Sequence, residues 1–198
     1  MGPDQAIYVP WVVWAASWFA AALWANRTVK RPALGSQTLY RVFEFGGFFL
    51  LLSYVVRRSS DGHYSMAVNG APLWSLSDDV KWAMVGVAAL GFLFCWWARI
   101  HLGRFWSGSV TRKEGHRVVD SGPYAIVRHP IYTGVIAAAL ATMAVRGTQF
   151  AIAGTALLVV GYYLKGRLEE RFLRAELGAQ AYDAYARKTA MLVPFVRI

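Results

Sequence analysis

Five long apolar stretches, almost free of charge, constrain this chain of 198 residues more than any other feature of its sequence. A helix needs about 20 predominantly apolar residues to cross the hydrocarbon of a bilayer. The five stretches are residues 7–25, 39–56, 82–98, 130–145 and 147–164. Charged residues make up only 16% of the chain, whereas soluble domains carry about a quarter. The pattern predicts an all-α fold, a polytopic membrane bundle of about five transmembrane helices.

The connections between the stretches predict how the helices are joined. Only residues 146–148 can form the turn between the last two stretches, which should therefore make an antiparallel helical hairpin. The fifth helix is expected to continue out of the membrane through residues 164–177 and to end near Gly178. We treat the chain as one domain, in which residues 1–98 supply the N-terminal spans and residues 99–198 the functional half.

Basic residues predict the orientation of the bundle. Most of the 21 lysines and arginines follow the first, third and fifth stretches, and such residues accumulate on the cytoplasmic side. The N-terminus is therefore expected outside, with residues 99–129 and the C-terminal segment in the cytoplasm. The first stretch lacks a basic n-region, so it is expected to remain as an anchor. The net charge of +10 favours anionic lipid headgroups and is not arranged as a nucleic-acid surface.

Metal and disulfide chemistry have little support in the sequence. Cys95 is the single cysteine, which excludes an intrachain disulfide. The four histidines have no acidic or cysteine neighbour at metal-ligand spacing, and we expect no metal. Glu44 lies inside the second stretch, where a carboxylate is costly unless paired, and Arg41 one turn earlier is its expected partner.

The stretch "SGPYAIVRHPIYTG" brings polar groups to the edge of the fourth apolar stretch. Pro130 fits the first helical position and places His129 at the N-cap. The free amides there, beside Arg128, would suit an anionic group. Glu169 and Glu170 follow the fifth stretch by five or six residues and could hold a cation. Together the two sites predict a ligand that carries both a carboxylate and a positive charge.

Three strings in the second half of the chain carry a family resemblance. "LGRFWSG", "EGHRVVDSGPYAIVRHPIYTG" and "EERFLRAELGAQAYDAYARKTAMLVPF" resemble the integral-membrane isoprenylcysteine carboxyl methyltransferase family and its phospholipid methyltransferase relatives. The resemblance covers roughly residues 99–195. The ordered set GPY, RHPxYxG, EE, YxxY and a terminal proline is specific for the family and not for the substrate. It implies S-adenosylmethionine as the methyl donor and a lipophilic acceptor from the bilayer.

The resemblance also implies roles for individual residues. The cofactor site would be lined by His116, Val118, Val119, Tyr124, His129, Pro130, Tyr132 and Glu169. On the acceptor and catalytic side we expect Lys165, Arg128, Glu170 and Arg104. Lys165 stands where the eukaryotic enzymes have an arginine that handles the substrate, and lysine offers a point charge instead of a planar fork.

The chemical class of the methyl acceptor stays open, and three other functions are alternatives to methyl transfer to such an acceptor. A prenylcysteine-like carboxylate or a related small lipophilic nucleophile is expected. A carboxylate needs no base, a thiol needs a nearby cation, and an amine needs a proton acceptor, for which Glu170 is the candidate. Phospholipid amine methylation is the first alternative, although the chain lacks a Gly-x-Gly motif. An NADPH-dependent membrane sterol reductase is the second, although Val135 instead of an acid follows Gly134. A non-enzymatic membrane scaffold is the third.

Overall fold

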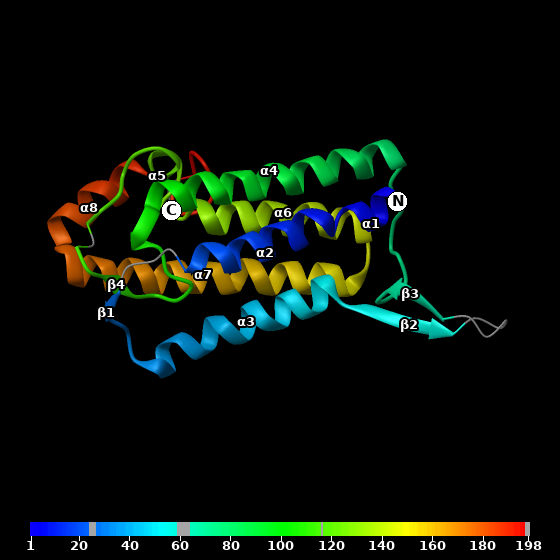
Figure 1. Ribbon diagram of the computed structural model, residues 1–198, viewed down its shortest axis with the longest axis horizontal. Coiled ribbons are helices and arrows are strands. Elements are labelled where there is room, and N and C mark those ends of the chain that lie inside the picture. Colours follow the sequence, from blue (N-terminus) through cyan, green and yellow to red (C-terminus); the bar gives the residue numbers. More distant parts are fainter. Residues whose placement is uncertain (24–26, 59–63, 116, 197–198) are drawn as a thin grey trace.

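Long helices lying side by side dominate the chain (Figure 1). The computed structural model describes residues 1–23, 27–58, 64–115 and 117–196. The helices are α1 Pro3–Ala6, α2 Val9–Ala22, α3 Leu34–Leu52, α4 Asp78–Leu102 with a 3-10 turn at Gly103–Phe105, α5 Pro123–Ile126, α6 Pro130–Arg146, α7 Gln149–Leu177 and α8 Ala179–Lys188. Strand β1 Thr28–Lys30 pairs antiparallel with β4 Arg112–Lys113, and β2 Tyr54–Arg58 with β3 Tyr64–Val68. The predicted all-α class is confirmed, with these two short ladders added to it.

Glycines allow two helix pairs to approach closely, α4 against α6 and α3 against α7. A Cβ atom on Gly134 would lie 2.6 Å from Cys95 Sγ, and one on Gly47 would lie 2.7 Å from Leu158 Cγ. No side chain larger than hydrogen fits at either crossing, which is the small-residue packing typical of membrane helices. Around these crossings lies the apolar core, which includes Trp11, Leu51, Ala88, Phe92, Val135, Ala138 and Leu158.

The predicted hairpin of the fourth and fifth stretches is confirmed. Helix α6 ends at Arg146 and α7 begins at Gln149. Gly147 takes the left-handed conformation, with φ of 60°, which only glycine adopts at no steric cost. The side chain of Thr148 accepts a hydrogen bond from the Ala151 amide at 3.2 Å and so caps α7. Helix α7 then runs to Leu177, and Gly178 follows it as predicted.

Buried Arg146 ties this hairpin to helix α3. Its guanidinium donates to the carbonyl of Leu51 and, at 2.8 Å, to the carbonyl of Ser53. These carbonyls belong to the end of α3, where the last C=O groups lack helical partners. The charged tip of the hairpin therefore satisfies the open end of a neighbouring helix.

Two apolar stretches differ from their predicted helices. In the first, predicted over residues 7–25, helix α2 begins only at Val9, and a break at Ile7 and Tyr8 separates it from the short helix α1 that precedes the stretch. The break arises because Pro10 has no N–H and its ring opposes the carbonyl of Ala6. The second ends as a helix at Leu52, not at residue 56, and residues 54–58 form strand β2 instead. Pairing with β3 provides partners for the backbone of this segment.

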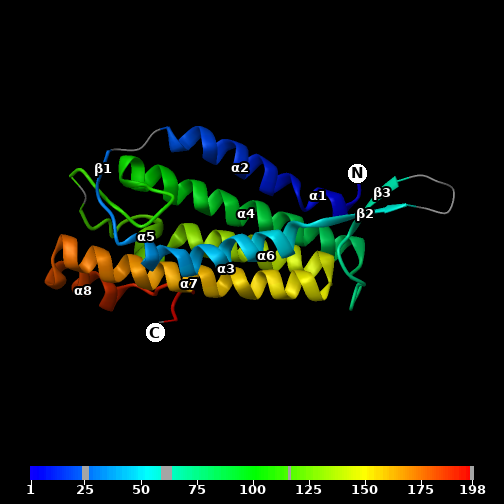
Figure 2. The ribbon, with the colours of Figure 1, turned by 90° about the horizontal axis from the view of Figure 1, so that it is seen from below.

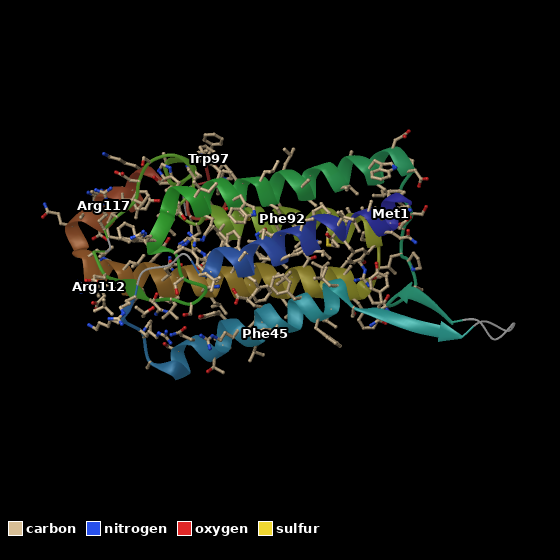
Figure 3. All side chains as sticks on the ribbon, in the orientation of Figure 1. Met1, Phe45, Phe92, Trp97, Arg112 and Arg117 are labelled. Atoms are coloured by element: carbon tan, nitrogen blue, oxygen red, sulfur yellow. The ribbon has the colours of Figure 1, made fainter. Side chains whose placement is uncertain are left out.

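Helix length and composition test only part of the prediction that five helices span a membrane. Within the described residues, one helix, Asp78–Phe105 with its 3-10 turn, is long and apolar enough to cross a membrane, and Pro130–Arg146 is a shorter apolar helix. Large apolar side chains such as Phe45 and Trp97 point outward from α3 and α4 and are 74% and 48% exposed (Figure 3). Five spans remain a prediction.

The polar segments gather at one end of the bundle. Helices α5 and α8 and strands β1 and β4 lie together there, and strands β2 and β3 lie at the opposite end in both views (Figures 1 and 2). The segments predicted to share a face, residues 99–129 and 165–196, thus meet at the same end.

Candidate functional site

A cavity of about 260 Å³ opens at the polar end of the bundle. Its volume is near the lower end of the roughly 300–1,000 Å³ range of small-molecule sites. Helices α2, α5, α6, α7 and α8 and the loop after α4 contribute to its wall. Nine of the predicted site residues line it: Val118, Val119, Tyr124, Arg128, His129, Pro130, Tyr132, Lys165 and Glu169. The fold therefore brings together side chains from two separate stretches of the sequence, residues 118–132 and 165–169.

The C-terminal segment holds the turn that enters α6. The amides of Arg128 and His129 donate to the carbonyls of Ala190 and Met191 at 2.7 and 3.2 Å. His129 occupies the N-cap position, as predicted, but its side chain makes no capping hydrogen bond. The backbone of the C-terminal segment therefore occupies these two amides, and an anion at the first amides of α6 stays a prediction.

Arg128 and Glu170 form a buried ion pair beneath the turn. Arg128 Nε donates to Glu170 Oε1 at 2.6 Å, and its Nη1 donates to the carbonyls of Ala186, at 3.0 Å, and Thr189. Burial alone would raise the pKa of the Glu170 carboxyl, but hydrogen bonds from His129 and Arg128 outweigh it and lower the pKa to about 2. Glu170 is therefore ionised at neutral pH and holds the turn in place. Its geometry gives no support to a role as a proton acceptor.

Tyr132, His129 and Glu169 form a second polar cluster, on the cavity wall. The rings of His129 and Tyr132 stack at 5.1 Å with an angle of 5° between their planes. Tyr132 Oη donates to Glu169 Oε2 at 2.6 Å, and His129 Nδ1 lies 3.7 Å from the same oxygen. His129 Nε2 lies 3.1 Å from Glu170 Oε1. One imidazole thus stands between the two carboxylates.

Lys165 is buried and paired with helix α3. Its Nζ lies 3.2 Å from Glu44 Oε1. Three tyrosine rings surround the ammonium, at 5.1 to 5.5 Å from Nζ to the ring centroids: Tyr40, Tyr132 and Tyr162. The predicted Arg41–Glu44 pair is wrong. Packing of α3 on α7 brings Glu44 to Lys165, and Arg41 donates to Gln37 at 3.2 Å.

The remaining predicted residues lie elsewhere. Arg104 is exposed on the 3-10 turn after α4 and does not line the cavity. His116 lies outside the described residues. Arg99, at the end of α4, is fully buried and donates to the carbonyls of Gly103 and Ala21 at 2.6 and 2.7 Å. It therefore joins α2 to the loop that covers the cavity.

The sequence interpretation missed an aromatic wall. Trp14 and Trp18 of α2 line the cavity, and the ring of Trp18 lies 5.5 Å from that of Trp106 in the loop after α4. Tyr185 of α8 also lines it and donates to the carbonyl of Tyr124 at 2.8 Å. The YxxY string predicted the tyrosines, whereas no motif marked the tryptophans, which lie among the N-terminal spans and outside the half that was expected to be functional.

Two buried polar atoms in the cavity wall lack partners within the part of the chain that the structure describes. They are Trp14 Nε1 and Thr111 Oγ1. Buried polar atoms are nearly always hydrogen-bonded. The wall therefore has free hydrogen-bonding capacity for a ligand.

The fold and the cavity wall together define the class of protein. It is an α-helical bundle with a ligand-sized cavity at one end, lined by aromatic and charged side chains. Residues 84–175 match the model of the isoprenylcysteine carboxyl methyltransferase (ICMT) family.

Two curated relatives carry names of the same reaction class. The chain is similar to methanethiol S-methyltransferase 2 of Bradyrhizobium diazoefficiens, with 34% identity over 135 residues, which are 62% of this chain and 50% of the relative. It is also similar to protein-S-isoprenylcysteine O-methyltransferase B of Arabidopsis thaliana, with 31% identity over 88 residues, 44% of each chain. The chain thus spans about half the length of these relatives.

Proposed function

We propose that the chain is an integral-membrane methyltransferase that binds S-adenosylmethionine in the cavity at the polar end of its bundle. Methyl transfer to a lipophilic nucleophile would take place there, on the cytoplasmic side, with the N-terminus outside. The observation that carries the proposal is the convergence of nine predicted site residues on one cavity. The match of residues 84–175 to the ICMT family model and the names of both relatives support the reaction class.

The residues of the cavity wall suit this donor. A sulfonium and an amino group are cationic, and Glu169 offers a carboxylate whose side chain is 29% exposed. The rings of Tyr124 and Tyr132 can stabilise a cation through their π faces. Thr111 Oγ1 and Trp14 Nε1 add buried hydrogen-bonding groups without partners in the described structure. We assign Val118 and Val119 to contacts with the apolar parts of the donor.

The chain's own contribution is to position the reactants and to exclude water. When bound, the donor would supply a methyl group that a nucleophile attacks in line, with the donor sulfur as the leaving group. Fixing two reactants at attack distance can be worth about 7–11 kcal/mol. The Arg128–Glu170 pair and the C-terminal segment hold the entry of α6 rigid, and the tryptophan wall encloses the apolar side.

The acceptor is proposed to have an apolar body and a nucleophilic end. Trp14, Trp18 and Trp106 line one side of the cavity and suit the apolar body. The printed names of the relatives include a thiol acceptor, methanethiol, and a prenylated cysteine. A thiol and a carboxylate are therefore the two acceptor classes to compare.

Thermal unfolding of the purified chain in detergent tests the proposal. Saturating S-adenosylmethionine should raise the melting temperature, because a ligand that binds only the folded state stabilises it. Glu169→Gln should reduce this shift. A folded protein whose melting temperature responds neither to S-adenosylmethionine nor to its demethylated product would exclude the proposed function.

A further inference from the structure

Each buried cation on the cavity wall already has a carboxylate partner. Arg128 Nε lies 2.6 Å from Glu170, and Lys165 Nζ lies 3.2 Å from Glu44. All four side chains are mostly buried, with exposed fractions of 6% and 13% in the first pair and 10% and 14% in the second. An anionic acceptor would face these neutralised pairs, and a buried charge without a partner is costly. The charge balance therefore favours an acceptor that enters neutral.

The Lys165–Glu44 pair lies between two cavities. Lys165 lines the main cavity, whereas Glu44 lines a second one on the side of α3, together with Tyr40, Arg41 and Phe45. Gly108 and Ser109 line both cavities, so the two adjoin. A proton that reaches Glu44 from the main cavity can leave on the other side.

Tyrosine rings fix the position of the lysine ammonium. Tyr132 is one of the three rings around Nζ, and its hydroxyl donates to Glu169 on the donor side. The ammonium is therefore held beside the place assigned to the methyl donor. A cation in that position favours the thiolate form of a nearby thiol.

We propose that Glu44 and Lys165 form a proton relay and that the acceptor is a neutral lipophilic thiol. This inference rests on the proposed methyl transfer. The acceptor's S–H bond breaks, and its proton passes to Lys165 Nζ as Nζ gives one of its own protons to Glu44. The thiolate then lies beside an ammonium that has kept its charge. The electron pair of the thiolate sulfur forms the new S–CH₃ bond, while the bond from the methyl group to the donor's sulfonium breaks and leaves its pair on the donor sulfur.

Four charged or titratable groups act on Glu44 and belong to the relay's pH dependence. They are Lys165 and Tyr162 on α7, Arg41 on its own helix, and Tyr132 on α6. In the proposed relay the proton leaves Glu44 through the α3-side cavity, which returns the pair to its starting charges.

The experiment compares two acceptors of similar size, decanethiol and decanoate, with the full chain in detergent and methyl-labelled S-adenosylmethionine. The methyl thioether should form at least 100 times faster than methyl decanoate.

A second experiment uses the Glu44→Gln variant, which should turn over decanethiol at least ten times more slowly than the wild type at pH 7. This difference in turnover should shrink as the pH approaches the pKa of the thiol, because a thiol that is already ionised in solution needs no relay. For the same reason the variant should methylate 4-nitrothiophenol, which is ionised at pH 7.

A double variant separates a lost relay from a lost fold. Glu44→Gln alone leaves the Lys165 ammonium buried without its partner, which is destabilising. Glu44→Gln with Lys165→Met removes both charges, and it should keep the melting-temperature shift with S-adenosylmethionine while losing decanethiol turnover.

Three results would overturn the relay: decanoate methylated as fast as decanethiol, an unchanged pH profile in Glu44→Gln, or wild-type thiol turnover in the double variant. Each of these can occur while the wild-type chain still shows the shift with S-adenosylmethionine. Loss of that shift in the wild type would instead exclude methyl transfer itself.

Discussion

At the scale of single residues, His129 joins the two carboxylates of the site. Its Nε2 lies 3.1 Å from Glu170, its Nδ1 lies 3.7 Å from Glu169, and its ring stacks on Tyr132. Glu170 is held in the structural ion pair with Arg128, whereas Glu169 lines the cavity. A change at His129 should therefore affect both the rigidity of the α6 entry and the binding of a ligand.

The first prediction concerns coupling between His129 and Glu169. His129→Ala and Glu169→Gln should each weaken S-adenosylmethionine binding by about 1–3 kcal/mol, as expected for the loss of a charged hydrogen bond. The double variant should depart from the sum by about 0.5 kcal/mol or more, because contacting residues are not additive. Isothermal titration calorimetry measures all three affinities, with exposed Arg187→Ala as the control. Strict additivity would show that the two side chains act independently.

The second prediction follows from the lowered pKa of Glu170. A carboxyl whose pKa falls from 4.5 to about 2 on folding stabilises the folded state at a pH above 4.5, and this contribution is lost as the pH falls toward 2. Glu170→Gln should therefore lower the unfolding free energy at pH 7 by roughly 3 kcal/mol, because a buried pair is broken. It should also flatten the pH dependence of the melting temperature between pH 4.5 and 2.

A matched control for Glu170 is Asp183, whose pair with Arg174 is exposed. Asp183→Asn should change the melting temperature little, because water and salt screen an exposed pair. A pH dependence as steep in Glu170→Gln as in the wild type would contradict the assignment of that dependence to this carboxyl.

The sequence identified nine residues that line the cavity because motifs carry local information. The turn and helix-start signals of residues 121–134 and the carboxylate pair at 169–170 are each short patterns, and a family resemblance could place them. The Lys165–Glu44 pair could not be found this way, because its members are far apart in the sequence and meet only through the packing of α3 on α7. Trp14 and Trp18 were missed for the same reason. Their roles, like those of the predicted residues, stay proposals.

At the scale of elements, apolar length predicted where helices lie and local chemistry decided where they end. The α6–α7 hairpin and the exit of α7 through Leu177 agree with prediction. The break before α2 and the strand after α3 do not, because hydropathy does not distinguish a proline-interrupted or strand-forming apolar run from a continuous helix. Register and close contacts between helices depend on side-chain shape, which hydropathy does not measure.

The third prediction tests the glycine crossing of α4 and α6. Gly134→Ala should lower the melting temperature, with a cost of about 1–3 kcal/mol, because its Cβ would lie 2.6 Å from Cys95 Sγ and the helices must separate. Gly86→Ala on α4 is the matched control, since a Cβ there meets nothing within 4 Å. Alanine also favours a helix over glycine, so the control should be neutral or stabilising. Equal melting temperatures for the two variants would count against the close crossing.

At the scale of the whole molecule, the bundle has two chemically different ends. Helix α8 lies at one end and the β2–β3 ladder at the other (Figure 2), and residues of α8 line the cavity. Exposed apolar side chains such as Phe45 and Trp97 lie between them (Figure 3). This arrangement fits a bilayer around the middle of the bundle, with the cavity open to one aqueous side.

The fourth prediction tests this polarity by labelling. Cys95 is the single cysteine, so Cys95→Ala gives a background into which one exposed cysteine can be placed at a time. Arg31→Cys and Arg187→Cys should react with a membrane-impermeant maleimide only after cells are permeabilised. Ser75→Cys, near the opposite end, should react in intact cells. Labelling of all three positions from the same side would contradict the proposed topology.

The contact of Arg146 with α3 bears on the order in which the protein can be assembled in a membrane. The tip of the α6–α7 hairpin carries a guanidinium, and on the proposed topology it must pass through the hydrocarbon during biogenesis, where a bare charge is unfavourable. Its acceptors, the carbonyls of Leu51 and Ser53, belong to a helix that is synthesised earlier. Because the chain is synthesised from its N-terminus, helix α3 reaches the bilayer before the charged hairpin leaves the ribosome. The hairpin can therefore insert next to acceptor carbonyls that are already present.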